Sequence, residues 1–376
     1  MVDIDDNIFM LPGPVKMHPR VLRAMSQPAI AHRSGEFKKV NAEIRQLLQY
    51  VFQSKNEVAL ISGSGTAGVE SAITSLCRKT DPILNLANGK FGERLHELSK
   101  IYATPTLLSF PWGKPIDPEA VKESLEKHQY RAVTIVHNET STGVTNPLPE
   151  IASVVRKSGA MLILDGITSV GSLEVKPDEW GADITIFGSQ KCIAAPAGLA
   201  AVCVSKRAEG ELHSDTNYYL SLKKHIKKFQ EQDTPWTPAI PLFLAMREAL
   251  RMVKEEGLEN RIATSARLAD ACRTAAENIG LELYPEKAYA SNTLTAIKYP
   301  PGIKDSDFRK ALQDKYNVII AGAQDEIKGK VFRIGHMGIC SWTDMVATWG
   351  AIEATLNKMG YPVKPGCAVS AVIERM

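Results

Sequence analysis

The feature that most constrains the fold is an alternation of short apolar runs with helical patterns through the middle of the chain. The apolar runs predict buried strands at 57–63, 82–88, 131–138, 160–166 and 182–191. Helical patterns lie between them at 66–79, 91–102 and 149–159. This alternation is typical of βαβ units, in which helices connect parallel strands and cover both faces of a sheet. The sequence therefore predicts an α/β fold with a mostly parallel sheet, and the run at 199–206 predicts an antiparallel edge strand.

The pattern changes beyond residue 206. Residues 207–238 are polar and aromatic, and their basic run at 221–229 predicts a solvated helix face or a loop. Further on, we expect helices and strands at 241–257, 260–280, 293–300, 306–316, 331–338 and 343–360. A chain of 376 residues fits about two domains. We expect an extended segment over 1–20, a large domain over 21–260 and a smaller α+β domain over 261–376.

Charge and composition exclude several classes of protein. Lys and Arg number 45 against 42 Asp and Glu, a net charge of +3, which is far below the basic excess of a nucleic-acid binder. No apolar run approaches the roughly 18 residues that span a bilayer, and the acidic N-terminus lacks a signal-peptide pattern. The six scattered cysteines offer no closely spaced zinc ligands. We therefore expect a cytoplasmic protein with reduced thiols and no nucleic-acid partner, membrane contact or bound metal.

The segment SGSGTAGVE (62–70) joins a predicted strand to a predicted helix through glycines. Backbone N–H groups at a helix N-terminus bind anions, and Ser64 and Thr66 add hydroxyl donors. The glycines also match a dinucleotide pattern, but the ribose-binding acid is missing because the next strand ends in Asn88. A monophosphate site, a plain strand–helix turn and a dinucleotide site remain open for this loop alone.

Two charged residues follow predicted strands. Asp165 ends AMLILD, so we expect its carboxylate at the ligand-binding edge of the sheet, although a helix N-cap would also suit it. Lys191 follows DITIFGSQ, where partial burial would lower its pKa and make it a nucleophile; a surface lysine is the alternative. A phosphate loop, a carboxylate and a lysine at one sheet edge are the set that pyridoxal phosphate needs. A hydroxyl-rich loop at 137–143 and Arg333, suited to gripping a carboxylate, complete the candidates.

At this point the chain resembles the class V, fold-type I pyridoxal-phosphate aminotransferases, specifically the alanine–glyoxylate/serine–pyruvate branch. The similarity lies in motifs spread over nearly the whole chain: LPGPVKMHPRVLRAM (11–25), HRSGEF (32–37), SGSGTAGVE (62–70), NGKFGERL (88–95), HNETSTGV (137–144), DGITSVG (165–171), GSQKCIAAPAGLA (188–200), TPAIPLFLAMREAL (237–250) and FRIGHMG (332–338). The resemblance implies a seven-stranded, mostly parallel sheet between helices and a smaller C-terminal domain.

The resemblance also implies roles. Lys191 would be the Schiff-base lysine and proton carrier, and Asp165 would pair with the pyridine nitrogen. The other cofactor contacts would be the ring stackers Phe91 and Ile167, Thr140 near the phenolic oxygen, and the phosphate ligands Ser64, Gly65, Thr66 and Gln190. Arg333 would grip the substrate carboxylate, and Gly13 would line the substrate site. Thr237 would reach the phosphate of the second subunit in an obligatory homodimer, although Thr234 stands where some relatives carry a tyrosine.

The implied activity is ping-pong transamination from alanine or serine to glyoxylate or pyruvate. Arg33 resembles a residue that binds a distal anionic group in phosphoserine aminotransferases, so a donor preference for phosphoserine, aspartate or glutamate is the alternative. A catalytically silent scaffold is the alternative of another class. A cysteine desulfurase is disfavoured because Cys192 and Cys340 do not lie on a predicted mobile loop.

Overall fold

The computed structural model describes residues 7–376. Its larger sheet has seven strands in the order β2 (Glu57–Ser62), β10 (Leu199–Val204), β9 (Ile184–Gly188), β8 (Met161–Asp165), β5 (Ala132–Val136), β3 (Pro82–Ala87) and β4 (Thr104–Ser109). All neighbouring strands run parallel except β10, which is antiparallel to both β2 and β9. The predicted α/β class with a mostly parallel seven-stranded sheet is confirmed.

The prediction of an edge position for residues 199–206 is wrong. The strand is antiparallel as expected, but β2 pairs with its outer side and takes the edge. Every residue of β10 is buried. At an edge, such an apolar strand would expose unpaired backbone N–H and C=O groups that promote aggregation. The other edge is β4, which the sequence analysis missed because its residues are largely exposed and form no apolar run.

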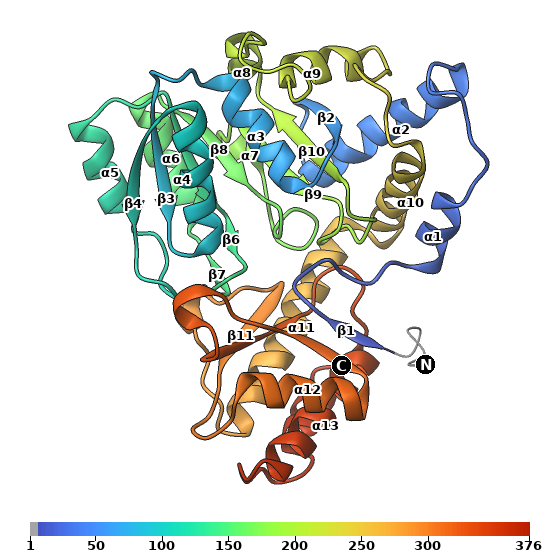
Figure 1. The fold of residues 1–376 in the computed structure, drawn as a ribbon, viewed down its shortest axis with the longest axis vertical. Coiled ribbons are helices and arrows are strands. Elements are labelled where there is room, and N and C mark those ends of the chain that lie inside the picture. The colour runs from blue at the N-terminus through green and yellow to red at the C-terminus, as the bar shows by residue number, and fades with distance from the viewer. Residues whose placement is uncertain (1–6) are drawn as a thin grey trace.

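Helices cover both faces of this sheet (Figure 1). One face packs against α1 (Pro19–Met25), α2 (Gly35–Phe52), α5 (Pro118–Lys127), α6 (Leu148–Ser158) and α10 (Ile240–Glu256). The other packs against α3 (Gly65–Leu76), α4 (Lys90–Tyr102), α8 (Lys206–Glu211) and α9 (Leu222–Gln230). The basic run at 221–229 forms most of α9, whose buried Leu222, Ile226 and Phe229 leave its lysines on the solvent side. Short elements complete this unit: β6 (Asn138–Glu139), β7 (Val144–Thr145) and α7 (Pro177–Trp180).

A second sheet of four strands lies below the first in Figure 1, in the order β1 (Ile8–Met10), β12 (Val318–Gly322), β13 (Val331–Gly335) and β11 (Leu294–Lys298). Its helices are α11 (Leu258–Asn278), α12 (Asp305–Tyr316), α13 (Trp342–Lys358) and α14 (Cys367–Ile373), with short 3-10 turns η2 (Lys287–Tyr289) and η3 (Asp325–Ile327). Within residues 7–376, no helix combines the length and apolarity needed to cross a bilayer.

The helix α11 joins the two cores. Its first residue, Leu258, packs in the core of the larger sheet, whereas Leu268 and Cys272 belong to the core of the second. This change of partner supports our proposed domain boundary at 260–261. Of the predicted extended segment, residues 1–6 lie outside the described part, and Ile8–Met10 form β1, which adds to the second sheet parallel to β12. The N-terminal segment therefore links the second sheet to the first.

Candidate active site

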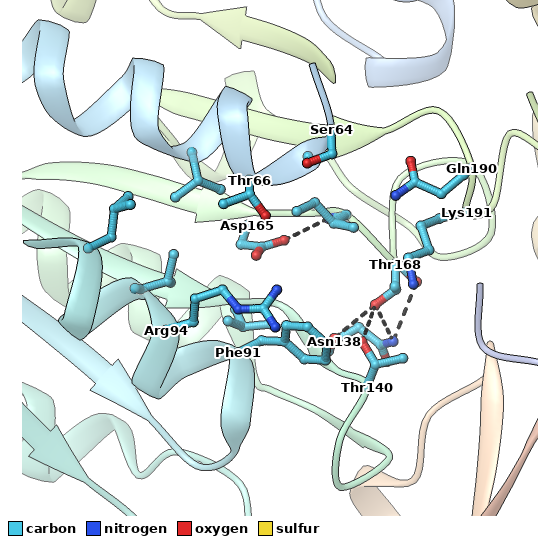
Figure 2. A pocket seen from close by; sticks show the side chains of 16 residues that line it. Ser64, Thr66, Phe91, Arg94, Asn138, Thr140, Asp165, Thr168, Gln190 and Lys191 are labelled. Atoms are coloured by element: carbon cyan, nitrogen blue, oxygen red, sulfur yellow. Dashed lines mark hydrogen bonds between the residues drawn. The ribbon is translucent and has the colours of Figure 1, made fainter. Parts of the chain in front are cut away.

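The carboxyl ends of the central strands meet in one cavity of about 150 Å³. Asp165 ends β8, and Lys191 follows β9. The start of α3 and the first turn of α4 close other sides, as Figure 2 shows. The predicted residues that line this cavity are Ser64, Gly65, Thr66, Phe91, Thr140, Asp165, Ile167, Gln190 and Lys191. The structure thus gathers in one place residues that the chain separates by more than a hundred positions.

An anion cradle forms at the N-terminus of α3. Ser64 is the N-cap residue, but its side chain caps no backbone group, and Figure 2 shows the Ser64 and Thr66 hydroxyls at the cavity. A Cβ on Gly65 would lie 2.6 Å from Cδ1 of Ile167, so a larger residue here would displace that side chain. Gln190 also lines the cavity. Free donors at a helix start, with the helix dipole, suit a phosphate.

The buried carboxyl group of Asp165 is suited to pair with a cationic group of a ligand. It is 7% exposed, and burial raises its pKa to about 7. The backbone N–H of Ile167 donates to it at 2.9 Å and opposes this rise, whereas the negative charge of Glu139 adds to it. Because burial disfavours the charged form, a ligand N–H⁺ beside this carboxyl would restore its ionised state.

Lys191 faces the cavity from the opposite side. Its Nζ donates to the carbonyl oxygens of Pro12 at 2.8 Å and Gly13 at 3.2 Å. Burial lowers the pKa of Lys191 to about 8, so a substantial neutral fraction is available as a nucleophile near physiological pH. Gly13 has φ +89°, and a Cβ there would lie 2.3 Å from Cδ of Lys191. The structure therefore places Gly13 against the lysine, and the close contact requires a glycine.

Arg333 lies in β13 of the second sheet and reaches the same region. Its Nη1 donates to the carbonyl of Thr140 at 2.8 Å, and its Nε and Nη2 donate to the carbonyl of Gly322 at 3.1 and 2.6 Å. Burial lowers the pKa of Arg333 to about 10, and the negative charge of Glu139 opposes that change. Among the described residues Arg333 forms no ion pair, so its positive charge remains available to a carboxylate ligand.

Of the predicted residues, Gly13, Arg33, Thr237 and Arg333 do not line this cavity, and Arg33 and Thr237 lie in other parts of the structure. Arg33 forms an ion pair with Asp233 and donates to the carbonyl of Thr234 at 2.6 Å. Thr237 lies with Thr234 in a separate small pocket beside Tyr219. A single chain therefore brings neither Arg33 nor Thr237 to Lys191. The expected contact of Thr237 concerns a second subunit and stays a prediction.

Three polar cavity residues were not predicted from the sequence: Arg94, Asn138 and Thr168. Arg94 lines the cavity and places its Cζ 4.7 Å from the centroid of the Phe91 ring. Asn138 donates to Oγ1 of Thr168 at 2.9 Å, and that oxygen lies 3.3 Å from Oγ1 of Thr140. All three lie inside motifs quoted above, at 88–95, 137–144 and 165–171. The signal was present, but it did not show which side chains of each motif face the cavity.

These residues fit pyridoxal phosphate. The α3 cradle suits its phosphate, Asp165 suits its ring nitrogen, and Lys191 suits its aldehyde. Phe91 and Ile167 offer apolar surfaces for the ring. Within residues 7–376, no group of three or more His, Cys, Asp or Glu side chains is placed to hold a metal.

Comparisons with known proteins agree with this choice of cofactor. The model of the family "aminotransferase class-V" matches residues 17–329. An uncharacterized aminotransferase of Methanocaldococcus jannaschii is 42% identical over 96% of this chain and 96% of its own. The serine–glyoxylate aminotransferase of Arabidopsis thaliana is 33% identical over 96% of this chain and 93% of its own. The crystal structure of the ureidoglycine–glyoxylate aminotransferase of Bacillus subtilis matches with a TM-score of 0.93 and 30% identity, covering 98% of this chain and 97% of the other.

The family match covers most of the chain, and the fold agrees with it throughout. Pyridoxal phosphate is the cofactor that the family and its structural neighbours imply. The chain belongs to the class-V aminotransferases, a family of pyridoxal-phosphate enzymes.

Proposed function

We propose that this aminotransferase moves the amino group of a small, uncharged L-amino acid, alanine or serine, to glyoxylate or pyruvate by a ping-pong mechanism. The observation that carries the proposal is the cavity in which Lys191, Asp165 and the start of α3 meet beside the buried Arg333. Arg333 offers a grip for an α-carboxylate beside this cavity, and the Arabidopsis relative is named for serine and glyoxylate.

Bound pyridoxal phosphate supplies an electron sink that stabilises negative charge at the α-carbon of the amino acid. We assign its phosphate to Ser64, Gly65, Thr66 and Gln190, its ring faces to Phe91 and Ile167, and its oxygen side to Thr140. Asp165 would keep the ring nitrogen protonated, because a buried carboxylate is stable only beside a positive partner.

Lys191 would move the proton. With a pKa of about 8, its neutral Nζ can accept the α-proton of a bound amino acid and later return it on the same face. The carbonyls of Pro12 and Gly13 would hold the resulting ammonium. Arg333 would orient the substrate by binding its α-carboxylate, and the bonds to Thr140 and Gly322 fix the guanidinium in advance.

The donor class follows from the position of Arg33. Phosphoserine, aspartate and glutamate need a second cationic grip, and Arg33 was the candidate. Its guanidinium is already compensated by Asp233 and bonded to Thr234, outside the cavity. Arg33 therefore does not supply the second grip, and we favour alanine or serine as donors; Arg94 is the other arginine at the cavity and contacts the Phe91 ring.

A desulfurase reaction is disfavoured by the thiols. Burial raises the pKa of Cys192 and of Cys340, so both are held as inert thiols. All six cysteines are free, in keeping with the cytoplasm as the expected compartment.

The proposed assembly is a homodimer that shares its active sites. Tyr218 is 70% exposed and Tyr219 is 44% exposed, and the Tyr218 ring stacks on Trp236 with centroids 4.5 Å apart. Trp236 directly precedes Thr237, and this exposed aromatic cluster is suited to contact a second copy of the chain. Mixing Lys191→Ala protein with a Thr237 variant should test the shared site, because hybrid dimers would regain one intact site.

Donor specificity is tested by steady-state assays. Alanine and serine with glyoxylate or pyruvate should give kcat/KM values at least ten-fold above those of aspartate, glutamate and phosphoserine. A preference for any acidic donor would overturn the proposed donor class. The absence of transamination with every pair, in protein that binds the cofactor, would favour a silent scaffold instead.

A further inference from the structure

Glu139 is a fully buried carboxylate that the proposed chemistry does not use. It ends β6 and is 0% exposed. Burial raises its pKa, and four hydrogen bonds oppose that rise. Its Oε1 accepts from the N and Oγ of Ser141 at 3.0 and 2.6 Å, and its Oε2 accepts from the N of Phe91 and of Gly92, both at 3.0 Å. A buried carboxylate so fully bonded has a defined orientation.

On one side, this carboxylate holds the start of α4. The N-cap residue of α4 is Gly89, which has no side chain to cap the helix. Oε2 of Glu139 instead binds the second and third backbone N–H groups, and Oγ of Ser141 accepts from the first, that of Lys90, at 3.0 Å. A Cβ on Gly89 would lie 2.4 Å from Cγ of Glu139. The helix turn that presents Phe91 therefore rests on a carboxylate from another part of the chain.

On the other side, the same carboxylate fixes the loop that holds Arg333. Thr140 lies between Glu139 and Ser141, so the bonds of Oε1 clamp both of its neighbours. The carbonyl of Thr140 accepts from Nη1 of Arg333, and its hydroxyl lies 3.3 Å from that of Thr168 at the cavity. The negative charge of Glu139 also favours the charged guanidinium in its buried setting.

We infer that Glu139 is a positioning residue that couples two parts of the active site. It fixes the position of Phe91, at the start of α4, relative to that of Arg333, which the Thr140 loop holds. The inference rests on the proposed roles of those two residues. Glu139 does not line the cavity, so it would act through α4 and through Thr140. Both carboxylate oxygens accept only from N–H or O–H donors, so an amide cannot replace it: an NH₂ group on either side would face another donor.

The test is Glu139→Gln, with Glu150→Gln as the matched control on the exposed first turn of α6. Pyridoxal phosphate is titrated into cofactor-free protein and followed by the visible circular dichroism of the bound cofactor. The KM for L-alanine and L-serine is measured on the saturated enzyme. We expect the cofactor dissociation constant and the KM each to rise roughly ten-fold, because a lost hydrogen bond to a charged group has about that effect. The control should match the unaltered enzyme.

Unchanged values for both quantities in folded Glu139→Gln protein would overturn the inference. A rise in only one of them would do the same, because coupling requires both. If Glu139→Gln protein does not fold, Ser141→Ala removes one bond on Oε1 and the cap of Lys90 while it keeps the charge. The Ser141→Ala variant should bind the cofactor several-fold more weakly, and unchanged cofactor binding would contradict the inference. The titration needs no turnover, so a wrong donor assignment cannot be mistaken for a failure of Glu139.

Discussion

The Nζ of Lys191 lies 2.8 Å from the carbonyl oxygen of Pro12. Pro12 follows β1, which belongs to the second sheet, whereas Lys191 follows β9 of the first. A Cβ on Gly335, at the end of β13, would lie 2.3 Å from the carbonyl of Leu11, so the segment crosses this strand tightly. Lys191 is thus held by the segment that joins the two sheets.

Replacing Lys191 should remove the chemistry and leave the fold. Lys191→Ala deletes the amine that carries the proton, so kcat should fall by at least about a thousand-fold. The control Lys157→Ala changes an exposed lysine of α6 and should retain full activity. Thermal unfolding by circular dichroism should give similar midpoints for all three proteins. Unchanged transamination by Lys191→Ala protein would refute the proposed role of this residue.

The raised pKa of Asp165 makes the stability of the cofactor-free protein depend on pH. The folded state keeps the proton up to its pKa of about 7, whereas the unfolded chain loses it near the ordinary aspartate pKa of 3.8. Folded protein therefore binds more protons between these values, and its free energy of unfolding should fall as pH rises from 4 to 7 and then level off.

Asp165→Asn should abolish this fall in the free energy of unfolding, which is on the order of a few kcal/mol. The variant should be more stable than the unaltered cofactor-free protein at pH 8, but not at pH 4, in urea unfolding. Its transamination should fall at least about a hundred-fold, because an amide cannot hold the ring nitrogen protonated. Equal stabilities of the two proteins at pH 8 would contradict the account of this carboxyl.

Arg333→Lys should separate charge from geometry. Lysine keeps the positive charge but cannot bind Thr140, Gly322 and a carboxylate with one planar group. We expect the KM for L-alanine to rise about ten- to hundred-fold in steady-state kinetics, with a smaller change in kcat. An unchanged KM would place the carboxylate grip elsewhere.

Arg33→Ala should leave the order of donors as it is. The substitution breaks the ion pair with Asp233, which lies outside the cavity, so kcat/KM for alanine and serine should change less than about three-fold. Selective loss of activity toward phosphoserine or aspartate, seen by comparing all donors, would bring Arg33 into the active site and favour the alternative substrate class.

The sequence predicted those elements whose signals lie in adjacent residues of the chain. The apolar run before Asp165 and the glycines before α3 revealed the strand ends, and both lie at the cavity. The edge assignment of β10 failed because strand order depends on which distant strand, here β2, returns to pair. β4 escaped notice because exposed residues carry no periodic apolar signal.

The residues at and behind the cavity that were not predicted depend on distant contacts. In the sequence, Glu139 is one of several polar residues in its loop. Only the packing of α4 against β6 makes it a helix cap. Arg94 likewise gains its place from the helix turn that follows Phe91. Arg33 shows the converse: its motif suggested an anion site, but its partners Asp233 and Thr234 lie two hundred positions along the chain.

The most direct test of the central claim is the visible absorbance spectrum of the purified protein supplied with pyridoxal phosphate, recorded before and after addition of one L-amino acid and no acceptor. We predict a visible cofactor band that bleaches within seconds to minutes with alanine or serine and returns when glyoxylate or pyruvate is added. Lys191→Ala protein should not complete this cycle. A protein that gains no visible band, or whose band no amino acid bleaches, would contradict the proposed transamination.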